Sequence, residues 1–174
     1  MKRFFYFIIL FLMLFIPSQN VSSRTISNTN SNLFNEQEEV VQVFNCSDQK
    51  IYITREDVDL MAKVVYAESN CEPFEGKVAV ASVILNRLQY PEFPKTVKGV
   101  VTQRGAFSCV KNGSIDVTAN KESYNAVSQA LRGVDPTGKS IFFYNPKIAT
   151  SQWMKNIRKK NVKSIGNHVF FVVN

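Results

Sequence analysis

The chain has 174 residues, of which 45% are hydrophobic and 12% aromatic, and a formal net charge of +7. The first 50 or so residues do not resemble a core, which leaves room for one domain of about 120 residues. A single histidine and the lack of a CxxC pair exclude histidine-based zinc sites such as HExxH, and no GxSxG turn is present for a serine triad. No metal or cofactor is therefore expected.

The first 23 residues are predicted to be a signal peptide. Lys2 and Arg3 precede the apolar run Phe4–Ile16, which is short for a membrane span and ends at Pro17. Cleavage is expected within Ser18–Ser23, and the alternative is an uncleaved membrane anchor. Either way, the rest of the chain is expected outside the cytoplasm, where a basic protein meets the polyanionic cell wall and not nucleic acid.

Residues 24–50 are predicted to be a flexible linker, and residues 51–174 the functional domain. The linker is rich in serine and asparagine and carries too little apolar surface to fold. Near its end, the VVQVF run at residues 40–44 is either a short strand or a peptide lying on the domain.

The domain is predicted to be α+β, mostly helical with a few short strands. Thr54 is expected to cap the first helix, Pro73 to open the second, and Asn120 to cap the third long helix. The second helix is apolar on nearly every face, which predicts a buried rod. In chain order, the predicted elements are helices over 54–69, 73–88 and 96–102, extended chain over 103–117 with a turn at Lys111–Gly113, a helix over 120–132, a strand over 141–144, a helix over 150–159 and a strand over 169–173.

Glu68, near the end of the first predicted helix, is the strongest candidate for a catalytic residue. It follows Met61, Val64 and Val65 by seven, four and three residues, so a helix places it on the apolar face. A carboxyl group there is poorly solvated, which predicts a raised pKa and a proton available for general acid catalysis. The alternative is a polar residue at a frayed helix end.

Cleavage of a glycosidic bond ordinarily needs a second carboxylate as nucleophile or base. The candidates are Glu72, Glu75 and Asp116. Glu72 and Glu75 lie at a helix start, where negative charge offsets the helix dipole, and this structural role is favoured for both. If no second carboxylate reaches the site, a mechanism with a single acid remains.

Four sequence blocks resemble one known family. They read YAESNCEPFEGKVAVASVILNR, FPKTVKGVVTQRGAFSCV, FFYNP and IGNHVFF, in this order. Together they resemble the catalytic domain of the SleB/CwlJ-type cell-wall hydrolases, the spore cortex-lytic enzymes, over roughly residues 54–174. The resemblance implies a lysozyme-like fold and lytic transglycosylation of spore-cortex peptidoglycan during germination. Glu68 matches the family's catalytic glutamate, and would act as general acid and then as base.

Other residues in the blocks are candidates for binding the glycan. Gln103, Phe107, Tyr144 and Asn145 offer hydrogen bonds to acetamido groups and a ring for sugar faces, although each could equally belong to the core or to a turn. His168 precedes an apolar strand and is either a substrate-binding or a structural histidine. Longer family members carry an N-terminal wall-binding domain. Recognition is here expected from the groove, helped by basic residues over 155–163.

Three cysteines leave an odd one in an exported chain. Cys46 lies in the predicted linker, whereas Cys71 and Cys109 lie inside the blocks and are candidates for a disulfide. The alternative is that both stay reduced and behave as small hydrophobic residues. A free Cys71 or Cys109 beside His168 would also allow a second reading, a cysteine peptidase or amidase that acts on the wall's peptides.

A third reading is a non-catalytic module that binds the wall. All three readings name peptidoglycan as the partner, at the cell wall or in the spore cortex outside the inner membrane. Nucleic acid is not expected, contact with a membrane is expected only through the signal segment, and the protein is expected to be a monomer.

Overall fold

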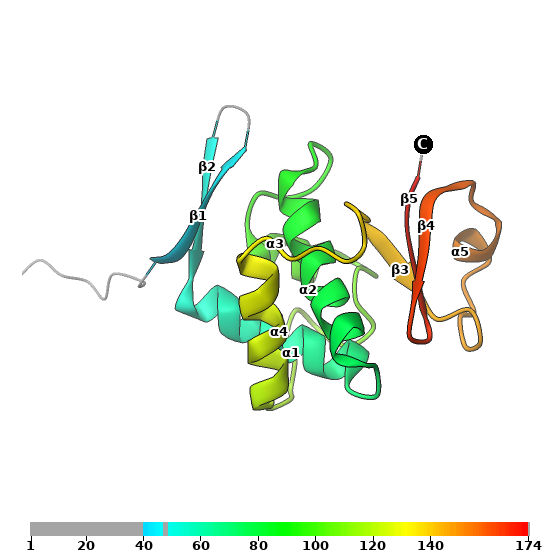
Figure 1. Cartoon of the computed structure of the whole chain (residues 1–174), viewed down its shortest axis with the longest axis horizontal. Coiled ribbons are helices and arrows are strands. Elements are labelled where there is room, and N and C mark those ends of the chain that lie inside the picture. Colours follow the sequence, from blue (N-terminus) through cyan, green and yellow to red (C-terminus); the bar gives the residue numbers. More distant parts are fainter. Residues whose placement is uncertain (1–39, 47–48, 174) are drawn as a thin grey trace, which may run out of the picture. The chain divides into compact units, whose positions relative to one another are not determined.

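A computed structural model describes residues 40–46 and 49–173 of the chain (Figure 1). The predicted signal peptide and most of the predicted linker lie outside these residues. Within the described part, no helix has the length and apolar character needed to cross a membrane. The elements are β1 (Val40–Cys46), β2 (Gln49–Thr54), α1 (Arg55–Ser69), α2 (Phe74–Gln89), α3 (Val97–Thr102), α4 (Lys121–Leu131), β3 (Phe142–Tyr144), α5 (Gln152–Asn156), β4 (Lys159–Ile165) and β5 (His168–Val173).

Helix α2 is the buried rod that the sequence predicts. It packs against α1, α3 and α4 (Figure 1), and its residues from Gly76 to Leu88 are all buried. Helix α1 begins at a capping box in which Thr54 and Asp57 each accept the other's backbone N–H. Asn120 caps α4 in the same manner, by accepting from Ser123. Local capping therefore sets where these helices begin, and burial of α2 supplies most of their stability.

The three-stranded sheet has the antiparallel order β3-β5-β4. Its central strand, β5, contributes Phe170 and Phe171, both fully buried. Phe143 of β3 stacks on Phe170 with ring centroids 5.6 Å apart, and Phe170 belongs to the same hydrophobic core as α1 and α2. The sheet is therefore attached to the helices through apolar side chains on one of its faces.

The predicted linker ends earlier than expected. Strands β1 and β2 form an antiparallel hairpin, and Ile51 and Ile53 of β2 are buried in the core. The VVQVF run is therefore a strand, and the structured part extends back to Val40. Pairing with β2 thus decides between the two alternatives that the sequence left open for VVQVF.

Two further predictions were wrong. The segment over 103–117 is not extended chain, since turns fill most of 103–109 and its pairing is limited to one bridge between Lys111 and Ser114, which closes the predicted turn at 111–113. The helix predicted over 150–159 is only the five-residue α5, and the following β4 was missed. Strand β4 is exposed over most of its length, and its sequence lacks the alternation of apolar and polar residues that predicts a strand. Pairing with β5 therefore stabilises β4.

Candidate functional site

Glu68 lies on the last turn of α1 and is half-buried. Its Oε1 atom accepts two hydrogen bonds, from Ser108 Oγ and from the backbone N–H of Cys109, each 2.9 Å long. Both donors belong to the loop that follows α3. Two donors on one oxygen fix the orientation of the carboxylate and leave its other oxygen for chemistry.

This environment differs from the one that the sequence predicts. Met61, Val64 and Val65 are fully buried, as the helical spacing requires, but the Glu68 carboxylate turns away from them toward polar donors. The apolar pocket expected around Glu68 is therefore replaced by a partly solvated, hydrogen-bonded position. Its geometry is set by the loop over residues 103–109 more than by the helix.

Glu72 is buried, with 9% of its surface exposed. Its Oε2 accepts the backbone N–H of Asn167 at 2.8 Å, and its Oε1 accepts Asn167 Nδ2 at 3.2 Å. Burial raises the pKa of Glu72, but hydrogen bonds from Asn167 and the charges of His168 and Lys77 outweigh it, so the pKa lies below its ordinary value.

The space beside Glu72 is filled by the turn between β4 and β5. A Cβ atom built on Gly166 would lie 2.0 Å from Glu72 Oε2 and 2.9 Å from the Pro73 ring. Neither water nor a sugar carbon fits between such close neighbours. Glu72 therefore joins the sheet to the α1–α2 loop, and is not placed to act as nucleophile or base.

His168 is also a packing residue at this junction. It is 8% exposed, its ring meets that of Phe143 edge to face at 5.2 Å, and its Nδ1 lies 3.8 Å from Glu72 Oε1. Burial lowers the pKa of His168, against the opposite effect of the Glu72 and Glu68 carboxylates. An imidazole that is buried and packed against Phe143 suits a structural role better than contact with a substrate.

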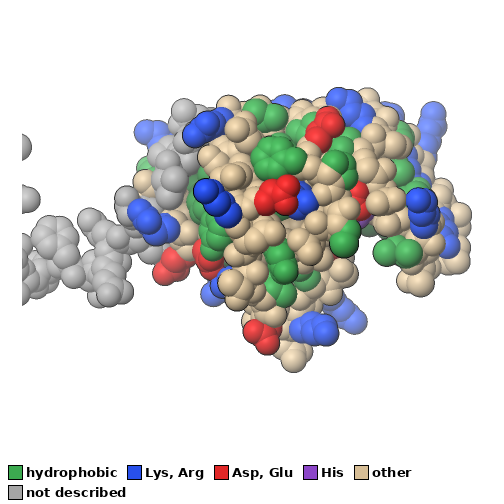
Figure 2. Space-filling model, turned by 60° about the horizontal axis from the view of Figure 1, so that its bottom comes forward, with side chains coloured by type: hydrophobic (Ala, Val, Ile, Leu, Met, Phe, Trp, Pro, Cys, Tyr) green, Lys and Arg blue, Asp and Glu red, His purple; other side chains and the backbone are tan. Residues whose placement is uncertain are grey.

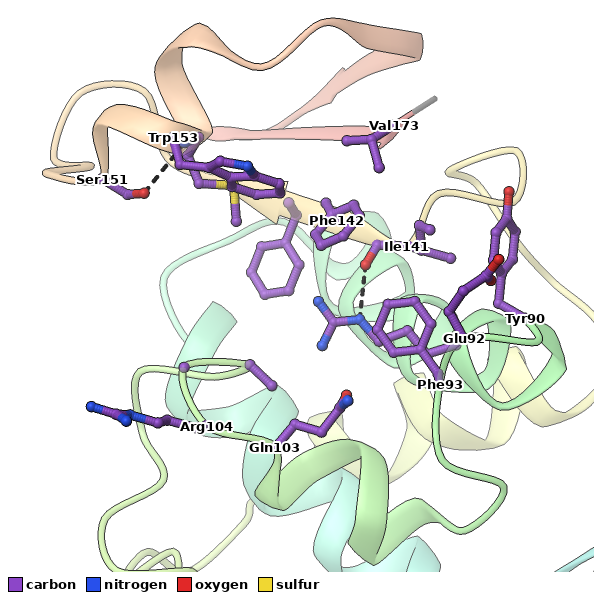
Figure 3. Close-up of a pocket in the computed structure, with 15 residues that line it drawn as sticks. Tyr90, Glu92, Phe93, Gln103, Arg104, Ile141, Phe142, Ser151, Trp153 and Val173 are labelled. Carbon is purple, nitrogen blue, oxygen red and sulfur yellow. Dashed lines mark hydrogen bonds between the residues drawn. The ribbon is translucent and has the colours of Figure 1, made fainter.

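A cavity of about 770 Å³ opens next to the loop that holds Glu68 (Figure 3). Figure 3 shows the Trp153 indole from α5 on one wall, Phe93 on another, and Gln103 on the wall facing Trp153. Ala106 also lines the cavity and precedes Ser108 by two residues. The Cα atoms of Ala106 and Ser108 can therefore be at most about 7 Å apart. The lining residues are Arg87, Tyr90, Glu92, Phe93, Gln103, Arg104, Gly105, Ala106, Ile141, Phe142, Phe143, Ser151, Trp153, Met154 and Val173.

Arg87 is a buried cation in the lining of this cavity. Its Nε donates to the carbonyl of Ile141 at 2.8 Å, the bond drawn in Figure 3, and its guanidinium lies 5.0 to 5.7 Å from the rings of Phe93, Phe107 and Phe142. Burial lowers the pKa of Arg87 to about 10, so the group stays charged near neutral pH. The cavity thus combines aromatic walls with the charged side chains of Arg87, Arg104 and Glu92, as a site for polar sugars would.

The structure separates the four predicted glycan-binding residues. Gln103 lines the cavity. Phe107 is only 5% exposed and packs on Phe143, so it belongs to the core. Tyr144 packs edge to face on Phe171, and the Asn145 side chain accepts the backbone N–H of Lys147 within a turn. Of the four, only Gln103 is thus placed among the described residues that line the cavity.

The predicted disulfide is absent, since Cys71 and Cys109 are both free. Cys71 is exposed, whereas Cys109 is half-buried and its backbone N–H donates to the Glu68 carboxylate. Burial, followed by the charge of Glu68, raises the pKa of Cys109 to about 12. A thiol with this pKa remains protonated and is a poor nucleophile. The side chain of Cys46 lies outside the described residues.

Sequence reasoning missed several residues of the site. Ser108 stands in the quoted block QRGAFSCV, but nothing in its spacing pairs it with a glutamate forty positions earlier. Asn167 pairs with Glu72 across 95 positions. Trp153, the single tryptophan, could have been noticed as a candidate ring for sugar faces. Among the described residues, no group of three or more His, Cys, Asp or Glu side chains could hold a metal ion.

Comparison with known proteins gives this geometry a context. Residues 71–171 match the protein family described as Cell Wall Hydrolase. The spore cortex-lytic enzyme of Bacillus cereus is 44% identical over 117 residues, which are 67% of this chain and 44% of that enzyme. That of Bacillus subtilis is 42% identical over 114 residues, 66% of this chain and 37% of that enzyme. This chain thus matches less than half the length of these curated relatives.

Two solved structures are similar as well. The catalytic domain of the Bacillus cereus SleB protein matches with a TM-score of 0.62 and 44% identity, over 68% of this chain and 91% of that one. The catalytic domain of the germination-specific lytic transglycosylase SleB from Bacillus anthracis matches with a TM-score of 0.63 and 43% identity, over 68% and 96%. These similarities confirm both the predicted resemblance and the α+β fold.

Proposed function

This chain belongs to the cell wall hydrolase family, and on that premise we propose that it is an enzyme that cleaves the glycan strands of peptidoglycan. We propose more narrowly that it is a lytic transglycosylase of the spore cortex, as its relatives' names suggest for them. One observation carries the proposal: the Glu68 carboxylate is fixed by two donors from the loop that also lines an aromatic cavity.

In the proposed reaction, Glu68 acts first as acid and then as base. With Oε1 engaged by Ser108 and Cys109, the other carboxyl oxygen donates its proton to the oxygen that bridges two sugars, and the bond from that oxygen to the anomeric carbon breaks. This anomeric carbon belongs to a muramic acid residue. The Glu68 carboxylate next removes the proton from the 6-hydroxyl of that muramic acid. That oxygen bonds to the anomeric carbon, closes a 1,6-anhydro ring and leaves Glu68 protonated again.

The surroundings of Glu72 support this route over hydrolysis. A hydrolase needs a second carboxylate to activate water or to bond the sugar. Glu72 is enclosed by Gly166 and Asn167, and Glu75 and Asp116 are exposed to solvent, with no contact to Glu68 among those described. An attacking group supplied by the sugar itself removes the need for a second carboxylate.

Product analysis tests the proposed reaction. Digestion of purified spore cortex should release fragments with 1,6-anhydromuramic acid ends, one water lighter than the products of hydrolysis, as mass spectrometry can measure. A muramidase digest of the same cortex serves as the control for water-added ends. Reducing ends on the released fragments would indicate hydrolysis and not transglycosylation. Free peptides would indicate a peptidase or amidase.

Cysteine chemistry is the second candidate, and the Cys109 environment disfavours it. We predict that iodoacetamide near pH 8 modifies the exposed Cys71 and spares Cys109, because a thiol with a pKa of about 12 yields almost no thiolate. Cleavage of peptidoglycan should continue in the modified protein. Peptide mapping locates the label, and an activity assay on the same sample measures cleavage. Loss of activity on labelling, together with a Cys71→Ser variant that is itself inactive, would favour the cysteine reading.

The proposal also includes the location of the protein in the cell. Residues 1–23 would export the chain, either as a cleaved signal peptide or as a retained anchor, and place the domain outside the cytoplasm at the wall or the spore cortex. The enzyme would act there as a monomer on peptidoglycan. The apolar run Phe4–Ile16 after Lys2 and Arg3 supports export.

A further inference from the structure

The C-terminal part of the chain carries an unusual charge distribution. Residues 136–174 contain no aspartate or glutamate. The same segment holds seven basic residues, Lys139, Lys147, Lys155, Arg158, Lys159, Lys160 and Lys163. These seven equal the whole formal excess of +7, so the remaining residues are balanced in charge. The positive charge of this protein therefore resides in the part of the fold that contains β3, α5, β4 and β5.

Five of these residues lie together in α5, in β4 and between them: Lys155, Arg158, Lys159, Lys160 and Lys163. We call these five the basic face. Strand β4 is an edge of the sheet, and all but Lys159 are exposed. Figure 2 shows blue side chains and no red ones on the visible surface at the end of the molecule that Figure 1 assigns to β4 and α5.

The cations of the basic face have no carboxylate partner among the described residues. The ion pairs found among the described residues involve other cations, as in the pair of Lys63 with Asp59. The Lys159 ammonium lies over the rings of Tyr144 and Phe171, at 5.3 and 5.2 Å, and the Lys163 ammonium donates to the carbonyl of Pro136. These contacts orient the lysines without neutralising them, so their charge remains available to an anion.

Protection of a sheet edge explains only part of this pattern. Lysines on an edge strand prevent pairing with another chain, which accounts for Lys160 and Lys163 on β4. Lys155 and Arg158 lie outside the strand and protect no edge. A surface that served solubility alone would also mix charges of both signs. The complete absence of acidic residues indicates selection for a negatively charged partner.

The basic face also adjoins the cavity. Lys159 pairs with Val173 in the sheet register, and Val173 lines the cavity. Lys155 follows Trp153 and Met154 of α5, which line it as well. A glycan strand that continues past Trp153 therefore passes the basic face. Peptidoglycan strands carry peptide stems with free carboxylates, which match the charge of this face.

We propose that the basic face binds the stem-peptide carboxylates of the glycan strand whose sugars occupy the cavity. This inference rests on the proposed function, because it takes peptidoglycan as the substrate. It adds a second contact, in which the basic face binds carboxylates while the cavity binds sugar rings. Binding through exposed charges should be salt-sensitive, and it should hold the enzyme near its insoluble substrate between cleavage events.

Retention on insoluble peptidoglycan tests the proposal. The probe variant replaces Lys155, Arg158 and Lys160 by glutamine. The control variant replaces Lys50, Lys98 and Lys121, which are exposed lysines outside the basic face, and so removes the same charge. Both are made in full-length Glu68→Gln protein to prevent digestion, and thermal unfolding checks that each is folded. The wall is supplied native, with its carboxylates converted to neutral amides, or with phosphate-containing polymers removed by acid.

The probe variant should bind native wall about tenfold more weakly than the control variant at low salt, with the difference shrinking as salt is added. Amidation of the wall should weaken the control variant to the level of the probe variant, and removal of phosphate polymers should change neither. Equal binding of the two variants would overturn the proposal, as would a loss of binding that follows phosphate removal. Retention is measured without turnover, so its failure is distinct from a failure of the proposed cleavage reaction.

Discussion

Replacement of Glu68 by glutamine is expected to reduce the cleavage of peptidoglycan by at least about a thousandfold, because one group supplies both the acid and the base of the reaction. Glutamine has nearly the same shape, and its carbonyl oxygen can still accept from Ser108 and from the Cys109 amide. Its amide nitrogen cannot give a proton to the leaving oxygen or take one from the 6-hydroxyl. The release of soluble fragments from purified cortex measures the loss.

Glu75→Gln is the matched control for this substitution. Glu75 lies exposed in the first turn of α2, seven residues after Glu68 in the chain, and makes no contact with the loop over 103–109 among those described. Its replacement should leave cleavage within about twofold, and both variants should unfold near the temperature of the original protein. Substantial activity in Glu68→Gln would remove Glu68 from the mechanism. Unchanged wall binding with no activity even in the original protein would favour the non-catalytic module.

Replacement of Gly166 by alanine is expected to destabilise the protein by about 3–5 kcal/mol, the largest effect that we predict for a single methyl group. Gly166 has a φ of +60°, which strains any other residue. The new Cβ would also lie 2.0 Å from Glu72 Oε2. Glu72 cannot swing aside at little cost, because its carboxylate is held by Asn167 and its neighbour Pro73 is 2.9 Å from the same Cβ.

Gly113→Ala separates the two causes. Gly113 has a φ of +79°, but no atom lies within 4 Å of a Cβ built there, so its replacement should cost only the backbone strain of about 1 kcal/mol. Chemical denaturation of both variants measures the difference. In a Glu72→Ala background, the added cost of Gly166→Ala should fall by at least half, because the clash is then reduced. Equal costs at the two glycines would show that the β4–β5 turn does not press on Glu72.

The link between Glu72 and Gly166 also bears on function. Only Ser69, Asn70 and Cys71 separate Glu68 from Glu72 in the chain, and the charges of both carboxylates raise the pKa of His168 against the effect of its burial. A displaced β4–β5 turn would therefore alter the wall of the site as well as the stability of the sheet. Loss of activity in Gly166→Ala beyond the loss of folded protein would report this coupling.

The amino-acid sequence was sufficient to predict helices α1 to α4 and to single out the catalytic candidate. Caps at Thr54 and Asn120 and the apolar run of α2 act within a few residues, so local reasoning suffices for them. The four blocks likewise identified the family and pointed to Glu68 without any coordinates. The charge asymmetry of residues 136–174 is also visible in the sequence alone.

The construction of the site depends on contacts that form only when the chain folds. The partners of Glu68 and Glu72 lie 40 or more residues away, β4 is formed by its pairing with β5, and Phe107 turns into the core and not toward a sugar. Each of these depends on contacts between segments that are distant in the chain, and their energies have no local signature in composition or periodicity. A carboxylate can therefore be found in a sequence, whereas the donors that orient it are found only once the chain has folded.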